Sequence, residues 1–234
     1  MHDLNQIIQS KISWKKREAT NVLDKDWDNL IILDACRHDM FEEVIGESES
    51  IYSAGSNSAN WRNNTFGSGN YPEIVYVSAN PHISSVRAEE YGFSFHEIKD
   101  VWDYGWDDEA DVVLPETMVE ETIKAAEEHP DKKIISHFMQ PHAPYLGEHG
   151  WEPEFVNVWD DVRARKVSTA KAKKALQENL EIAYPHAVEL GEKLDGKTVV
   201  TSDHGEFLGE RGVYGHGLDD FHHPAIRKVP WKTL

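Results

Sequence analysis

The sequence predicts an α/β protein, a three-layer α/β/α sandwich with a mostly parallel central sheet. Short, continuous apolar runs typical of strands buried on both faces occur at residues 29–34, 74–78, 133–139 and 197–202. Helical segments separate these runs, at residues 36–45, 115–129 and 166–194. Strands that alternate with helices need crossover connections, which give parallel pairing with helices on both faces of the sheet.

The helical segments differ in how they start and continue. Residues 1–28 have mixed charge and are expected to form a helical entry segment. Pro115 suits the first turn of the helix that follows it. Pro185 is expected to break or kink the helical segment around it, giving one helix or two.

Two stretches rich in Trp and Gly, residues 61–71 and 102–107, are expected to be loops near a functional site. The sequence contains neither an internal repeat nor a low-complexity linker. We therefore expect residues 1–234 to form a single domain.

Composition excludes several classes of function. The 24 basic and 42 acidic residues give a formal charge of −18, which argues against nucleic acid as a partner. The single cysteine, Cys36, excludes an internal disulfide and a cysteine-cluster metal site. Apolar runs fall far short of the roughly 20 residues that span a bilayer, and the polar N-terminus does not resemble a secretory signal. We expect a cytoplasmic protein without a membrane span.

Side chains that bind metals follow three of the four predicted strands. Asp34 ends the first run, His142 follows the third, and Asp203 and His204 follow the fourth. Because the carboxyl ends of parallel strands meet at one edge of a sheet, where ligands bind, these residues are expected to lie together. Neighbours within a strand point to opposite faces, so Asp203 and His204 share one centre only where the strand has ended, a freedom that Gly205 provides.

This combination of carboxylates and imidazoles suits zinc or manganese better than magnesium or calcium. The alternative interpretation is that Asp203 caps a helix and His204 is a surface residue. The convergence of Asp34 and His142 on the same edge favours a metal site.

Several segments resemble the alkaline phosphatase and sulfatase superfamily. Residues 201–210 (Thr-Ser-Asp-His-Gly-Glu-Phe-Leu-Gly-Glu) and 214–217 (Tyr-Gly-His-Gly) are similar to the C-terminal metal motif of the sulfatases. Residues 30–39 are similar to the family's first strand with its metal-binding Asp, residues 137–145 to the segment with a substrate-binding His, and Val229-Pro230 to its closing strand. The matches occur in family order, and the resemblance implies an alkaline phosphatase-like fold.

The resemblance also implies a nucleophile on the helix after the second strand. Sulfatases use a Cys in a Cys-x-Pro-x-Arg motif, which this sequence lacks, and Cys36 is expected to pack as a small apolar residue. Phosphatase and phosphotransferase members use Ser or Thr. The small-residue stretch 53–61 would place a hydroxyl at a helix N-terminus, where an anion is favoured. Ser58 is the first candidate and Ser56 the second, and Ser58 as a simple helix cap is the structural alternative.

We therefore expect Asp34, Asp203 and His204 to hold one divalent cation per chain, because Gln140 stands where two-metal relatives place an Asp. His216 is expected to be a further metal ligand or to bind the anion.

Catalytic roles are expected for three residues. Ser58 would attack the ester, and His142 would bind the transferred group or protonate the leaving oxygen. Arg37 would pair with anion oxygens or form a helix-face salt bridge. Glu206 and Glu210 are expected to be loop anchors or solvated carboxylates.

The expected function is metal-dependent hydrolysis of a phosphate or sulfate ester of a small molecule or glycan, through a covalent seryl intermediate. Two alternatives are open. One is a phosphotransferase acting on a glycan or lipid headgroup, and the other is a degenerate member that binds an anion without turnover. The sequence leaves the natural substrate and the oligomeric state open.

Overall fold

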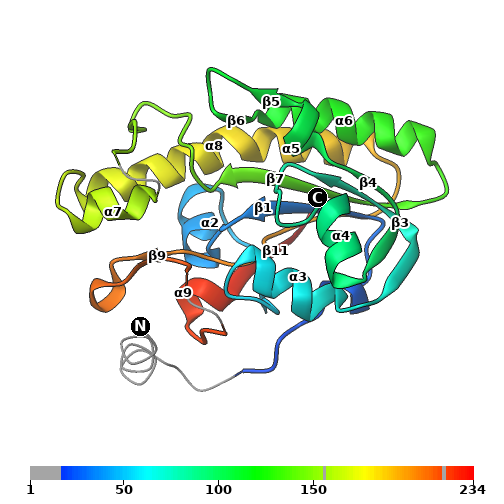
Figure 1. The fold of residues 1–234 in the computed structure, drawn as a ribbon, viewed down its shortest axis with the longest axis horizontal. Helices are drawn as coiled ribbons and strands as arrows, with labels where there is room; N and C mark the ends of the chain where they lie inside the picture. The colour runs from blue at the N-terminus through cyan, green and yellow to red at the C-terminus, as the bar shows by residue number, and fades with distance from the viewer. Residues whose placement is uncertain (1–16, 155–156, 218–219) are drawn as a thin grey trace.

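The computed structural model describes residues 17–154, 157–217 and 220–234 (Figure 1). A seven-stranded sheet runs through its centre in the order β2-β11-β8-β1-β7-β3-β4. The strands are β1 (Asn29–Asp34), β2 (Glu49–Tyr52), β3 (Asn70–Ser78), β4 (Ser94–Lys99), β7 (Lys133–Pro141), β8 (Thr198–Thr201) and β11 (Lys228–Thr233). Strands β8, β1, β7, β3 and β4 are parallel, and β11 pairs antiparallel with β8 and β2. The predicted mostly parallel α/β fold is confirmed.

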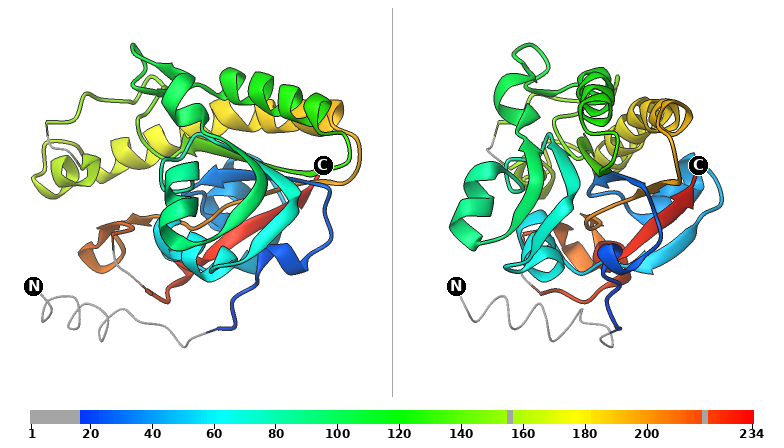
Figure 2. Two further views of the ribbon diagram at one scale, coloured as in Figure 1. Left: turned by 45° about the vertical axis from the view of Figure 1, so that its right-hand side comes forward. Right: turned by 90° about the vertical axis from the view of Figure 1, so that its right-hand side faces the viewer.

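Helices cover both faces of this sheet (Figure 2). The helices are α2 (His38–Val44), α3 (Ser58–Phe66), α4 (Ser85–Tyr91), α5 (Val101–Tyr104), α6 (Pro115–Glu128), α7 (Val158–Arg163), α8 (Thr169–Lys193) and α9 (Pro224–Arg227), with the 3-10 helices η1 (Val22–Asp24) and η2 (Glu210–Gly212). Two short antiparallel pairs complete the structure, β5 (Trp106–Asp107) with β6 (Val112–Val113) and β9 (Phe207–Leu208) with β10 (Tyr214–Gly215).

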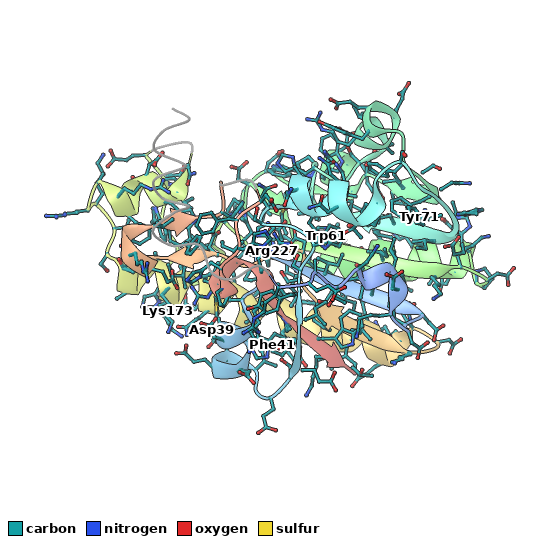
Figure 3. The ribbon with its side chains drawn as sticks, turned by 90° about the horizontal axis from the view of Figure 1, so that it is seen from below. Asp39, Phe41, Trp61, Tyr71, Lys173 and Arg227 are labelled. Carbon is teal, nitrogen blue, oxygen red and sulfur yellow. The ribbon has the colours of Figure 1, made fainter. Side chains whose placement is uncertain are left out.

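Alternating side chains of β1 divide the interior into two cores. Ile31 and Leu33 pack on one face with α2, α6 and α8, and Leu30 and Ile32 pack on the other with α3 and α4. Phe41 of α2 and Trp61 of α3 are fully buried members of the two cores (Figure 3). Because every residue of β1 is buried, its sequence shows no polar alternation, which is why it reads as a continuous apolar run.

Several predicted elements differ from the structure. The helical entry segment falls partly on residues 1–16, which lie outside the described residues, and residues 17–28 contain only η1. Stretch 61–71 is not a loop, since it contains the end of α3 and the start of β3, and stretch 102–107 lies in α5 and β5. Helix α8 continues through Pro185 as a single helix.

Within the described ranges, none of the helices combines the length and apolar character that crossing a bilayer requires.

Candidate active site

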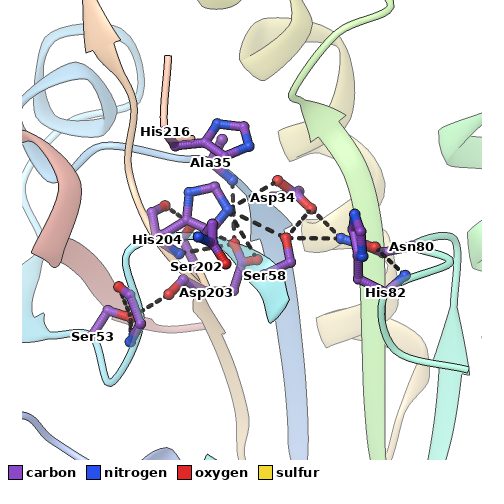
Figure 4. A network of polar contacts seen from close by, with 12 residues as sticks. Asp34, Ala35, Ser53, Ser58, Asn80, His82, Ser202, Asp203, His204 and His216 are labelled. Carbon is purple, nitrogen blue, oxygen red and sulfur yellow. Dashed lines mark hydrogen bonds and ion pairs between the residues drawn. The ribbon is translucent and has the colours of Figure 1, made fainter. Parts of the chain in front are cut away.

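The carboxyl edge of the sheet brings together Asp34 from the end of β1 and Asp203 and His204 from the turn after β8 (Figure 4). One ligating atom from each of these side chains lies within 4.8 Å of the others, and all three side chains are buried. The three residues are separated by up to 170 positions in the sequence, so their meeting follows from the parallel pairing of β1 with β8. The grouping matches what a tetrahedral or octahedral cation site needs.

His204 turns its Nε2 toward this cluster. Its Nδ1 lies 2.8 Å from the backbone carbonyl oxygen of Gly205, which accepts hydrogen bonds only. Nδ1 therefore carries a hydrogen, and in the neutral ring Nε2 is the nitrogen with the free lone pair. Nε2 lies 3.4 Å from Asp203 Oδ2 and 3.7 Å from Asp34 Oδ1, as expected of a metal-binding imidazole whose tautomer is fixed from behind.

The surroundings of Asp203 and Asp34 suit carboxylates that would bind a cation. Asp203 Oδ1 accepts hydrogen bonds from the backbone N–H groups of Ala35 and His204, at 3.3 and 2.9 Å. Its Oδ2 is buried without a hydrogen-bond partner among the described residues, although such atoms are normally paired. Burial would raise the pKa of Asp34, but the neighbouring imidazoles, His137 first, outweigh burial and lower this pKa well below its usual range.

Gly205 has a different role from the one expected. Its backbone does not need glycine's left-handed freedom, because its φ is outside the positive region. A Cβ at this position would lie 2.1 Å from the backbone oxygen of Ala225, and the Gly205 N–H donates to Ile226 O at 2.7 Å. Glycine is required here because the chain before β11 packs directly on the metal-motif turn.

Ser58 is the first residue of α3, and its hydroxyl faces the cluster (Figure 4). Its Oγ lies 3.3 Å from Asp34 Oδ2 and 3.3 Å from His204 Nε2. The side chain of Asn57 caps the helix, accepting from the N–H of Asn60. Because Asn57 is the cap, the Ser58 hydroxyl is not used in capping.

Asn80, which lies two residues after the predicted strand at 74–78 and was not expected to be a site residue, completes this arrangement. Its Nδ2 donates to Asp34 Oδ2 at 2.5 Å and to Ser58 Oγ at 3.1 Å. Its Oδ1 accepts from the N–H of His82 at 2.8 Å, which fixes the orientation of the amide. Asn80 follows β3 at the same sheet edge, so the rule that identified the other site residues also applied to it.

A second group of ligand-type side chains lies beside the first and consists of His142, Glu206 and His216. The rings of His204 and His216 are 4.4 Å apart, and those of His142 and His216 are 5.2 Å apart. Glu206 is fully buried and lies 2.9 Å from His216 Nδ1. It is therefore not solvated, and its pairing with His216 fits the other expected role, that of a loop anchor. Its position in the motif gave no sign of burial, since Glu is exposed in most proteins.

Glu206 and His216 form a charged pair in this second group. Burial would lower the pKa of His216, but the Glu206 carboxylate outweighs burial and raises it to about 9. His216 therefore carries a positive charge at neutral pH, which suits an imidazolium that faces an anion.

Arg37 forms the salt bridge that was one of its two expected roles. Its guanidinium contacts Asp39 at 2.6 Å and Glu210 at 2.5 Å, and it donates to the backbone oxygen of Glu206 at 3.0 Å. These partners already satisfy the guanidinium, so the pairing of Arg37 with anion oxygens finds no support in the structure. Cys36 packs in the core, as expected.

A pocket of about 1060 Å³ opens at His142 and His216. Its walls include the aromatic side chains of Tyr145, Trp151 and Trp159. The pocket gives a substrate larger than phosphate room beside the buried cluster.

Comparison with known proteins identifies the fold. No protein-family model matches the sequence, and no curated protein sequence does. Solved structures do match. The soluble domain of lipooligosaccharide phosphoethanolamine transferase A from Neisseria meningitidis aligns with a TM-score of 0.56 at 13% identity, over 94% of this chain and 79% of that domain. A putative sulfatase from Bacteroides thetaiotaomicron aligns with a TM-score of 0.53 at 13% identity, over 88% of this chain and 63% of that one. The chain has the alkaline phosphatase and sulfatase fold.

The integral membrane form of the same Neisseria meningitidis transferase aligns with a TM-score of 0.60 at 13% identity, over 98% of this chain. This chain spans 53% of that protein, about half of its length. The alkaline phosphatase-like core is thus what these proteins share with this chain.

Proposed function

We propose that this protein cleaves phosphate esters through Ser58, with a divalent cation held by Asp34, Asp203 and His204. The observation that supports this most strongly is the position of the Ser58 hydroxyl, 3.3 Å from both Asp34 Oδ2 and His204 Nε2. A hydroxyl this close to two ligands would share their cation.

The donor set fits such a cation. Two carboxylates and one neutral imidazole suit zinc or manganese, and Asp203 Oδ2, buried without a hydrogen-bond partner among the described residues, would gain one in a bound cation. When bound, the cation would lower the pKa of a nearby hydroxyl and offset charge on an ester oxygen.

The residues of this chain perform the remaining steps. Ser58 Oγ, having lost its proton to solvent, forms a bond to phosphorus as the bond from phosphorus to the leaving oxygen breaks. Asn80 Nδ2 orients Ser58 Oγ for this attack. His216, charged through Glu206, binds a non-bridging oxygen. His142, entering this step as the imidazolium, donates its Nε2 proton to the leaving oxygen, and its Nδ1–H, which points to the Ala143 carbonyl oxygen at 2.6 Å, fixes the orientation of the ring.

The seryl ester is then resolved by an incoming hydroxyl. If water enters, the Oγ–phosphorus bond breaks, the phosphate is released and the protein acts as a hydrolase. The missing Cys-x-Pro-x-Arg motif favours phosphate over sulfate as the group transferred.

A second candidate function, phosphotransfer onto a glycan or lipid headgroup, differs only in that an acceptor hydroxyl replaces water. Two observations favour it: the likeness to a phosphoethanolamine transferase and the aromatic-walled pocket beside His142 and His216, which has room for an acceptor.

Turnover assays distinguish these functions. Purified protein with Mn²⁺ or Zn²⁺ would be given p-nitrophenyl phosphate, bis(p-nitrophenyl) phosphate and p-nitrophenyl sulfate. We expect metal-dependent release of nitrophenol from the phosphate esters, with the sulfate ester cleaved least. Faster release when glycerol or a sugar alcohol is added, with the phosphoryl group recovered on the additive, would favour the transferase. Metal binding without turnover of any ester would indicate an anion-binding protein and contradict the proposal.

A further inference from the structure

His137 lies behind the proposed metal cluster, on β7, which neighbours β1 in the sheet, and is fully buried. Its Nδ1 is 2.8 Å from the hydroxyl of Tyr76 on β3. On the other side of the ring, Nε2 is 3.6 Å from Asp34 Oδ2 and 3.9 Å from Asp203 Oδ2. Within the described part of the chain, this Nε2 and Asp203 Oδ2 are both buried without a hydrogen-bond partner.

Tyr76 decides which nitrogen of His137 carries the hydrogen. Burial, followed by the charges of Asp203 and Asp34, raises the pKa of Tyr76 well above its usual value, so the phenol keeps its proton. A buried phenol proton needs an acceptor, and Nδ1 of His137 is placed to accept it. Nδ1 then has no hydrogen of its own, so Nε2 carries one.

The Nε2–H group consequently faces the two carboxylates. At 3.6 Å from Asp34 and 3.9 Å from Asp203 it is beyond the usual length of an N–H···O hydrogen bond, and a shift of a few tenths of an ångström in Asp34 would bring that carboxylate within range. The opposite tautomer would turn a bare nitrogen toward the carboxylates and leave the phenol proton without this acceptor.

We propose that His137, oriented by Tyr76, is a positioning residue whose Nε2–H holds the carboxylates of Asp34 and Asp203 in their metal-binding orientation. The inference rests on the proposed function, since it assumes that these carboxylates bind a cation. It assigns the Tyr76–His137 pair a role in metal affinity rather than in bond making.

Two substitutions that replace the imidazole by an amide, at two different distances from the backbone, test this role. Gln places its amide nitrogen near the position of Nε2, so His137→Gln keeps a donor to the carboxylates. Asn reaches only as far as Nδ1, so His137→Asn keeps a group for Tyr76 and removes that donor. We expect His137→Asn to weaken Mn²⁺ or Zn²⁺ binding, measured by calorimetry, by roughly 10–100-fold, the usual effect of losing such a partner. His137→Gln should bind close to the wild-type value.

A second measurement uses the unaltered protein. Two-bond ¹H–¹⁵N correlation spectra of the metal-free wild type, assigned by difference from His137→Gln, should show His137 as the Nε2–H tautomer. In Tyr76→Phe this preference should weaken.

The outcomes separate the inference from the proposed function. An Nδ1–H tautomer would overturn the inference, because Nε2 would then be free to bind the metal directly. Equal metal affinity in the wild type and His137→Asn would also overturn it. Equal loss of affinity in both His137 variants would do the same. Should His137→Asn not fold, the tautomer spectrum of the wild type decides. A wild-type protein that binds neither ion would overturn the proposed function and this inference together.

Discussion

The Oγ of Ser58 and the Nε2 of His204 lie 3.3 Å apart although 146 residues separate them in the sequence. The hydroxyl belongs to the first residue of a helix, and the imidazole belongs to a turn at the carboxyl end of a parallel strand. The start of a helix favours an anion because its first N–H groups are free to donate. The carboxyl end of a parallel strand lies at the edge of the sheet where ligands bind. The chemistry of the site depends on this meeting.

Replacing Ser58 by Ala should reduce kcat/KM for p-nitrophenyl phosphate by several orders of magnitude, because the attacking oxygen is removed. The three proposed metal-ligand side chains are untouched, so binding of Mn²⁺ should persist. Ser56→Ala is the matched control, since Ser56 is also buried in the same turn, and it should retain most of the activity. Unimpaired turnover by Ser58→Ala would show that another group attacks.

Asp203→Asn should weaken metal binding but stabilise the metal-free protein. Asn lacks the charge that binds a cation, so calorimetric affinity for Mn²⁺ should fall sharply. In the metal-free protein the substitution removes a buried carboxylate whose Oδ2 has no hydrogen-bond partner among the described residues, so the melting temperature should rise. Asp26→Asn, at a side chain 92% exposed, should change neither quantity. If Asp203→Asn lowered the metal-free melting temperature, the interpretation of Asp203 as an unpaired ligand would be wrong.

The sequence was informative where fully buried strands end in side chains that can bind a metal. The four apolar runs are all strands of the central sheet, and their carboxyl ends predicted that Asp34, Asp203 and His204 would meet. The edge strands β2 and β4 escaped notice because, partly exposed, they carry charged side chains such as Glu49 and Glu97.

The sequence also failed to indicate features that depend on tertiary packing. The start of α3 at Ser58 agrees with the expected helix N-terminus, but the rest of the helix, polar apart from a few buried positions such as Trp61, resembles a loop in sequence. Glu206 and His137 take their significance from partners brought close only by folding, and no local pattern indicates which Glu or His becomes buried. Asn80 is different, because its place after β3 was visible in the sequence.

The Glu206–His216 pair predicts a pH dependence. The pKa of His216 is raised to about 9, above the usual His value of about 6.5. The pair therefore stabilises the fold fully below the usual value, and this contribution is lost as the pH rises through about 9. In metal-free protein, the NMR titration of His216 should have its midpoint near pH 9. In Glu206→Gln the midpoint should fall, because the main contribution that opposes burial is removed and only the weaker effects of Asp34 and Asp203 still raise the pKa. An unchanged midpoint would rule out Glu206 as the cause.

Gly55 should tolerate no side chain. A Cβ there would lie 2.2 Å from the backbone nitrogen of Trp61, in the helix that begins at Ser58. The Ser53 hydroxyl, two residues before, donates to the Asp203 backbone oxygen, so any shift of this turn reaches the metal motif. Gly55→Ala should cost about 1–3 kcal/mol of unfolding free energy and reduce turnover.

Gly191 is the control for Gly55, measured by the same urea denaturation. A Cβ at Gly191 would meet only the side chain of the C-terminal Leu234 within 3.4 Å, and Ala favours the helix in which it lies. Gly191→Ala should therefore leave stability unchanged or raise it. Equal losses in both variants would contradict the proposed constraint at Gly55.

The covalent intermediate provides the most direct test of the account. Protein mixed with Mn²⁺ and bis(p-nitrophenyl) phosphate would be quenched in acid within the first turnovers, digested, and its peptides analysed by mass spectrometry. The account predicts a phosphoryl ester on Ser58, absent from Ser58→Ala. Burst release of nitrophenol with the phosphoryl group on another residue, or turnover with no modified peptide at any quench time, would contradict it.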